Sequence, residues 1–197
     1  MTKGDDTRAR IIEQSAPLFN KQGYAGTALS DLMEATGLQK GGIYRHFASK
    51  EELAAEAFDY AWRKAIELRA QGVESTPNAV DRLKRMIENF VELRTGLVPG
   101  GCPLLNTAID SDDGNAVMRE RARGALGNWQ TRLAKIAKQG LKDGQIREGT
   151  DPDALAALVI SQLEGALMIS RLNQTRQPLE WAKAHLTDYL ETRVRTA

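Results

Sequence analysis

Apolar and polar positions follow a helical spacing along almost the whole chain. Apolar residues recur every three or four positions in one segment after another, and no stretch alternates between apolar and polar residues as a half-buried strand does. No internal repeat is evident. The pattern predicts an all-α protein of about nine helices, of which the first three are short and close together and the rest are longer and amphipathic.

Breaks in this spacing give the expected helix bounds. The predicted helices span residues 7–23, 27–37, 37–47, 49–72, 76–96, 104–109, 115–142 and 152–173, with a last helix from Pro178. Pro17 lies inside the first of them, where it removes one backbone hydrogen bond and is expected to bend the helix.

Capping residues mark several of these helix starts. Ser49 is followed three residues later by Glu52, which is the spacing of a capping box. Thr27 and Thr76 are expected N-caps because a hydroxyl can accept a hydrogen bond from a free N–H of the first turn. Asp151, placed just before a proline, marks the clearest of the remaining starts.

Composition narrows the class of protein. The chain has 197 residues, a formal net charge of +1 and a single cysteine, Cys102, which excludes an internal disulfide and favours a reducing cytoplasm. The first residues do not resemble a secretory signal, and no apolar run approaches the roughly 20 residues that span a bilayer, so no membrane partner is expected. The net charge is too small to indicate nucleic acid, and a DNA-binding face has to come from local charge.

The segment GLQKGGIYRHF, residues 37–47, combines helical spacing with two adjacent glycines, Gly41 and Gly42. Each glycine costs a helix interior roughly 1 kcal/mol relative to alanine. Two short helices joined by a glycine-containing turn suit a helix-turn-helix, whose second helix enters the DNA major groove. Gly41 would then let the backbone approach DNA closely, and Gly42 would leave room beside the neighbouring helix.

Polar side chains around these glycines are candidate DNA contacts. They are Gln39, Lys40, Tyr44, Arg45 and His46, with Thr27 and Lys50 at the starts of flanking helices. Lysine, tyrosine and threonine commonly donate to phosphates, whereas arginine and glutamine can bind base edges. Two other interpretations stay open: a half-buried tyrosine beside a surface imidazole, and a solvated basic face.

Residues 23–53, GYAGTALSDLMEATGLQKGGIYRHFASKEEL, resemble the DNA-binding domain of the TetR family of bacterial transcriptional regulators. The matching features are Gly23-Tyr24, Thr27, the 29–37 helix, Lys40-Gly41, Tyr44, His46-Phe47 and the SKEEL segment at 49–53. The resemblance implies phosphate contacts by Thr27, Lys40, Tyr44, His46 and Lys50, and it places Gln39, Gly41 and Arg45 nearest the bases.

The same resemblance implies a helix-turn-helix domain at residues 1–50 and a helical effector-binding and dimerisation domain at 51–197. The expected protein is a homodimeric regulator, a repressor that an apolar or aromatic small molecule releases from a palindromic operator in double-stranded DNA. Two copies are needed because one short recognition helix contacts few bases. Helix 152–173 carries small residues that allow close helix approach, and with the last helix it is the expected dimer interface; these residues are Ala156, Ala157, Ser161, Gly165 and Ala166.

Large apolar residues on several helices are candidates for an effector pocket, although each of them also suits an ordinary core. They are Trp62, Met86, Phe90, Cys102, Trp129 and Met168. Cys102 precedes a proline at a helix start, so it is either a reactive sensor thiol or a small buried apolar residue.

Catalytic and metal-binding patterns do not stand out in the sequence. His46 and His185 lie far apart and without an acidic or cysteine cluster at ligand spacing, so no metal, no cofactor and no enzyme activity are expected. The rival class is a helical small-molecule carrier or protein-interaction module with a vestigial helix-turn-helix. The intact basic cluster from Lys40 to Lys50 favours the regulator. The sequence does not identify the effector, the operator or the regulated genes, nor does it separate repressor from activator.

Overall fold

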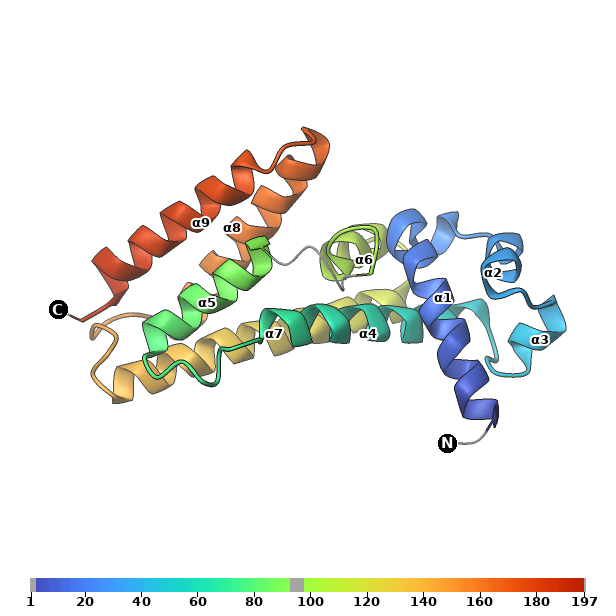
Figure 1. The fold of residues 1–197 in the computed structure, drawn as a ribbon, viewed down its shortest axis with the longest axis horizontal. Coiled ribbons are helices and arrows are strands. Elements are labelled where there is room, and N and C mark those ends of the chain that lie inside the picture. The colour runs from blue at the N-terminus through green and yellow to red at the C-terminus, as the bar shows by residue number, and fades with distance from the viewer. Residues whose placement is uncertain (1–2, 93–97, 197) are drawn as a thin grey trace. The chain divides into compact units, whose positions relative to one another are not determined.

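The computed structural model describes residues 3–92 and 98–196, and within them the chain is helical as predicted (Figure 1). The helices are α1 (Lys3–Gly26), α2 (Leu29–Thr36), α3 (Lys40–Tyr44), α4 (Lys50–Arg69), α5 (Ala79–Glu92), α6 (Pro103–Ser111), α7 (Ala116–Lys142), α8 (Pro152–Leu172) and α9 (Gln177–Tyr189), followed by a π-helical turn, η1 (Leu190–Val194). The predicted end of the fifth helix, at Gly96, lies outside the described residues.

Helix α1 begins at Lys3, earlier than predicted, and its non-helical residue is Gly23 rather than Pro17. Gly23 has φ 74° and ψ 174°, a conformation that residues with a side chain rarely adopt. The last residues of α1, from Tyr24 onward, therefore form a separate turn that leads into α2.

Two predicted helix starts are confirmed by their hydrogen bonds. The Ser49 hydroxyl accepts from the Glu52 N–H at 3.0 Å, while the Glu52 carboxylate accepts from the N–H of Ala48, one residue before the cap. The Asp151 carboxylate accepts from the backbone N–H groups of the second and third residues of α8, at 2.9 and 3.1 Å.

The two predicted threonine caps are wrong. The cap of α2 is Ala28, because the Thr27 hydroxyl donates backward to the Gly23 carbonyl oxygen at 2.7 Å. Helix α5 starts at Ala79 instead of Thr76, since the Asn78 side chain accepts from the next free backbone N–H groups. A threonine can donate to a preceding carbonyl as well as cap a following helix, and the sequence does not say which it will do.

The chain packs into two compact units, residues 1–66 with 96–126 and residues 67–95 with 127–197. Helices α4 and α7 each contribute to both units. Helix α6 and the first part of α7 thus pack in the same unit as the three N-terminal helices.

In the first unit, the core is formed by fully buried apolar residues from each of the four N-terminal helices: Ile11, Leu32, Ile43, Phe47 and Leu53. In the second unit, α8 and α9 lie side by side with α5 against them (Figure 1). Their buried residues include Leu83, Ile87, Leu163 and Leu186, and η1 adds Leu190. This core is continuous with the buried residues of η1.

Helix α8 is long and apolar enough, by length and composition, to cross a membrane, which the sequence analysis underestimated. Only 44% of its apolar window is buried within this chain. Its exposed apolar residues include Met168, Ile169 and Leu172, which occupy one end of the helix. Helix α8 is thus a core helix on one side and an exposed apolar surface on the other.

Candidate nucleic-acid interface

Helices α2 and α3 form the expected helix-turn-helix. Helix α2 ends at Gly37, whose φ of 65° is the left-handed conformation typical of a helix C-terminus. The chain then turns through Leu38 to Gln39, the N-terminal residue that precedes α3, and α3 occupies only Lys40–Tyr44. The glycine at residue 37 confirms the turn that the spacing predicted.

Two buried apolar residues hold α3 against the first unit, so its outer side is free for other contacts. Ile43 and Phe47 are each only 1% exposed. The opposite side presents the exposed residues Gln39, Lys40 and Arg45 to solvent.

The two glycines of α3 differ in their surroundings. A Cβ at Gly41 would meet nothing within 4 Å, so no packing inside the chain requires a glycine there. A Cβ at Gly42 would lie 3.4 Å from the Leu38 Cβ, an ordinary van der Waals distance. The expectation that Gly42 must leave room for a neighbouring helix is therefore wrong, whereas Gly41 leaves an open approach to the backbone.

Two lysines of this surface lie above tyrosine rings. The Lys40 Nζ is 6.0 Å from the ring centroid of Tyr44, and the Lys50 Nζ is 4.6 Å from that of Tyr24. An ammonium group above a tyrosine ring is attracted by the electrons of its face. Lys50 is consequently held at the first residue of α4. Tyr24, which the sequence analysis did not count as a site residue, is the group that holds it.

Arg8 on α1 braces the same surface from behind. Its guanidinium lies 4.6 Å from the Phe47 ring centroid, donates to the His46 carbonyl oxygen at 3.3 Å and pairs with Glu52 and Glu56. The hydrogen bond to Glu56 is the main reason why the pKa of Arg8 is raised above its ordinary value. All these contacts of Arg8 are with residues far along the chain, and the sequence pattern around Arg8 does not indicate them.

The remaining predicted DNA contacts divide into accessible and inaccessible residues. Tyr44, His46 and Lys50 are partly exposed, so their side chains can be reached from solvent. Thr27 is completely buried, and its hydroxyl already donates to Gly23. A phosphate contact by the Thr27 side chain is therefore excluded in this conformation.

Three of the candidate effector residues lie in the second unit. The rings of Phe90 and Trp129 stack with centroids 5.8 Å apart and an interplanar angle of 13°. The guanidinium of buried Arg69 lies 4.5 Å from the Phe90 centroid and 4.6 Å from that of Trp129. Met86 is buried on α5. The helical spacing predicted only apolar residues around Phe90 and Trp129, whereas the structure also places the guanidinium of Arg69 against both rings.

The other effector candidates are placed differently. Met168 is 43% exposed near the end of α8, and its place in an effector pocket stays a prediction. Trp62 and Cys102 belong to the first unit. Cys102 is 3% exposed at the N-terminus of α6, which favours the buried apolar residue over the accessible sensor thiol.

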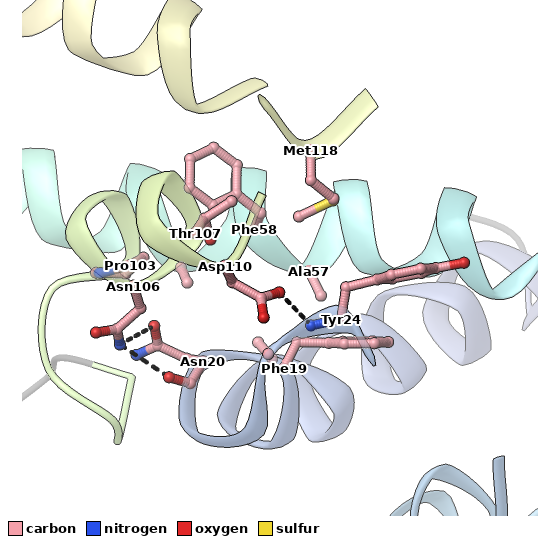
Figure 2. Close-up of a pocket in the computed structure, with 13 residues that line it drawn as sticks. Phe19, Asn20, Tyr24, Ala57, Phe58, Pro103, Asn106, Thr107, Asp110 and Met118 are labelled. Carbon is pink, nitrogen blue, oxygen red and sulfur yellow. Dashed lines mark hydrogen bonds between the residues drawn. The ribbon is translucent and has the colours of Figure 1, made fainter. Parts of the chain in front are cut away.

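A small hollow lies between α1, α4 and α6 in the first unit (Figure 2). Its volume is about 20 Å³, room for about one water molecule. It is bordered by Phe19 and Tyr24 of α1, Phe58 of α4 and Asp110 of α6. Among the described residues, no group of histidine, cysteine or acidic side chains is arranged to hold a metal ion.

Comparison with known sequence families identifies both parts of the chain. Residues 11–57 match the family described as bacterial regulatory proteins, tetR family. Residues 79–186 match the tetracyclin repressor-like C-terminal domain. The two matches include the helix-turn-helix and most of the second unit.

Relatives with known structures or curated names are similar over nearly their full length. A TetR transcriptional regulator from Chloroflexus aurantiacus J-10-FL has 48% identity, full coverage of both chains and a TM-score of 0.95. A TetR-family regulator from Cytophaga hutchinsonii has 35% identity over 100% of this chain and 98% of its own, with a TM-score of 0.93. The HTH-type transcriptional repressor DhaR from Mycobacterium sp. (strain GP1) is 25% identical over 88% of this chain and 86% of its own.

Proposed function

The chain belongs to the TetR family of bacterial transcriptional regulators, and we propose that it binds operator DNA through the exposed side of α3 and the start of α4. It is a ligand-responsive DNA-binding regulator, and its relatives are transcriptional regulators rather than enzymes. We call the proposed DNA contact the α3 surface; it consists of Gln39, Lys40, Gly41, Tyr44, Arg45, His46 and Lys50.

The observation that supports this proposal most is that α3 has one buried apolar side and one exposed polar side. Burial of Ile43 and Phe47 fixes the helix, while Lys40 and Arg45 stay exposed, so the basic side chains are available to DNA without local unfolding. We assign phosphate contacts to Lys40, Tyr44, His46 and Lys50. We assign base contacts to Gln39 and Arg45, because their side chains can hydrogen-bond to base edges. Gly41, with open space around it, permits close approach of the backbone.

The family acts as dimers, and we propose that the dimer forms through the exposed apolar sides of α8 and α9. Large apolar residues are exposed there, including Ile169, Leu172 and Trp181. Ile169 and Trp181 border a shallow apolar groove beside Gly165, where a partner's helix can approach closely. A contiguous exposed apolar patch of this kind is typical of a protein interface.

The effector belongs to the second unit in this proposal. Met86 and Trp129 are buried there, and Phe90 stacks on Trp129 beside the guanidinium of Arg69. An apolar or aromatic small molecule suits these side chains. Because its target is bacterial promoter DNA, we place the protein in the cytoplasm. We also propose that residues 1–50 form the DNA-binding domain and residues 51–197 the effector-binding and dimerisation domain.

Titration of DNA with single variants tests the α3 surface. The probes are a duplex from the promoter region beside the protein's own gene and a random duplex of equal length, followed by fluorescence anisotropy. Lys40→Ala should weaken binding to both and lower the slope of log K against log salt by about one unit. Arg45→Ala should cost roughly 1–3 kcal/mol on the promoter duplex and much less on the random one.

The matched control is Arg123→Ala, because Arg123 is an exposed arginine on α7, outside the α3 surface. If Arg45→Ala and Arg123→Ala behave alike on both duplexes, the base contact assigned to Arg45 is wrong. If Lys40→Ala leaves both affinities and the salt slope at the wild-type values, the α3 surface is not the DNA contact.

A further inference from the structure

Helices α1 and α6 are joined by polar contacts at two points, four residues apart in each segment of the chain. At the first point, the Asn106 Nδ2 donates to the carbonyl oxygen and the side-chain oxygen of Asn20, at 2.8 and 3.0 Å. At the second, the Asp110 carboxylate accepts from the Tyr24 N–H at 2.8 Å. Figure 2 shows both contacts between the same two helices. The two contacts lie on either side of the break at Gly23, so α6 holds both the helical part of α1 and the turn that follows it.

The first contact is the more enclosed of the two. Asn20 is only 7% exposed, and its amide also donates to the Pro99 and Gly101 carbonyl oxygens at 3.1 and 3.2 Å. Asn106 donates in addition to the Gly100 carbonyl oxygen at 2.9 Å. This network holds the segment before α6 and the start of α6 against α1. Asp110 lies on the same helix, so the network also fixes its position.

The second contact explains why residue 23 is a glycine. A Cβ at Gly23 would lie 2.5 Å from the Asp110 Oδ1, which is closer than a Cβ approaches an oxygen to which it is not bonded. The positive φ of Gly23 also turns the Tyr24 N–H out of the helical hydrogen-bonding pattern. The glycine therefore supplies both the space that the Asp110 carboxylate occupies and a conformation that presents the Tyr24 N–H to it.

The segment that Asp110 holds leads to two parts of the DNA-binding helices. The Gly23 carbonyl oxygen accepts from both the hydroxyl and the N–H of Thr27, immediately before α2. The ring of Tyr24 lies 4.6 Å from the Lys50 Nζ at the start of α4. A displacement of Asp110 would therefore reach the entry to α2 and the lysine of the α3 surface through a single short turn.

We propose that Asp110 is a positioning residue for DNA binding, which holds the Gly23–Tyr24 turn so that the Tyr24 ring fixes Lys50 in place for its phosphate. This inference rests on the proposed function, because it assigns Lys50 to the DNA contact. Asp110 itself touches no DNA in this proposal. Its effect is transmitted through the Gly23–Tyr24 turn, which links α6 to the entry of α2 and to Lys50 at the start of α4.

Three variants of the full-length protein separate positioning from charge. Asp110→Ala removes the acceptor of the Tyr24 N–H. Asp110→Asn keeps a carbonyl oxygen in the same place. Asp113→Ala is the charge-matched control, since Asp113 is an exposed aspartate three residues further along the chain, after the end of α6. Loss of one negative charge alone should strengthen binding to a polyanion or leave it unchanged.

Binding is measured by anisotropy on the promoter and random duplexes, and amide exchange of the segment containing Tyr24 is measured by hydrogen–deuterium exchange. Asp110→Ala should weaken promoter binding roughly 3- to 10-fold, lower the salt slope and speed exchange at Tyr24, while Asp110→Asn recovers most of the affinity. In a Lys50→Ala background, Asp110→Ala should add little further loss, because both changes act on the same phosphate contact.

Each result either supports or overturns the inference. It is overturned if Asp110→Ala binds DNA as tightly as Asp113→Ala, or if its loss adds in full to that of Lys50→Ala. A wild-type affinity for Lys50→Ala itself overturns the phosphate contact of Lys50 and this inference with it. Weak binding by Lys50→Ala with unchanged binding by Asp110→Ala leaves the proposed function intact and rejects only the role of Asp110.

Discussion

Gly165→Glu should convert the protein to monomers without disturbing the fold of the single chain. An added Cβ at Gly165 meets nothing within 4 Å, so the protomer has space for a side chain there. The same position borders the apolar groove with Ile169 and Trp181, which we assign to the dimer interface. A carboxylate buried there without a partner costs several kcal/mol, and two-fold symmetry introduces it twice.

A penalty of about 3 kcal/mol for each copy, about 6 kcal/mol in all, raises the dimer dissociation constant roughly 10,000-fold. Sedimentation velocity over a wide concentration range measures this constant. Gly124→Glu is the matched control, because Gly124 is an exposed glycine inside α7 that also has nothing within 4 Å. Both variants gain the same helix propensity, so a difference between them reports the interface alone. A Gly165→Glu protein that dimerises as tightly as Gly124→Glu would refute the assignment, and so would a monomeric wild type.

Two further predictions concern stability. Hydrogen bonds from Arg195 and Lys84 lower the pKa of Glu191 from 4.5 to about 2, so this carboxylate stabilises the fold above pH 4.5 and loses that effect as the pH falls toward 2. Because 37% of the side chain is exposed, Glu191→Gln should cost only about 1 kcal/mol at pH 7, with a deficit that shrinks below pH 4.5 in urea unfolding; a deficit independent of pH would contradict this. Ser15 is fully buried, with a hydroxyl that has no hydrogen-bond partner among the described residues, so Ser15→Ala should gain about 0.5–1 kcal/mol in thermal unfolding. Ser111→Ala should instead lose stability, because that buried hydroxyl donates to a backbone carbonyl, and equal effects of the two alanines would reject the argument.

Local features of the fold were predictable because local chemistry determines them. The aspartate at 151 caps α8, and the glycine at 37 ends α2, since each needs only its own neighbours in the chain. Threonines 27 and 76 were assigned wrongly because each hydroxyl had two local partners, one ahead and one behind. The polar residues in and around α3 could be identified as accessible from the sequence, because the helix has only five residues and the apolar ones face the core.

Contacts between distant segments could not be predicted in this way. Nothing in the sequence near Gly23 indicates that Asp110, far along the chain, accepts from the adjacent N–H. The same holds for Arg69, which lies against Phe90 and Trp129. Helical spacing identified the two aromatic residues as apolar positions but gave no reason to place an arginine beside them. Periodicity shows that a helix has an apolar side, but it does not show which element covers that side.

Helix α4 contains one residue that we assign to DNA binding and one that lies beside the proposed effector residues. Its first residue is Lys50, which we assign to a DNA phosphate, and its last is Arg69, whose guanidinium lies against the aromatic pair assigned to the effector. At 1.5 Å per residue, its 20 residues span about 30 Å. An effector changes DNA affinity only if it binds the two conformations unequally. A ligand that competes with Arg69 for the aromatic faces meets that condition, because it favours whichever position of the α4 end frees those faces.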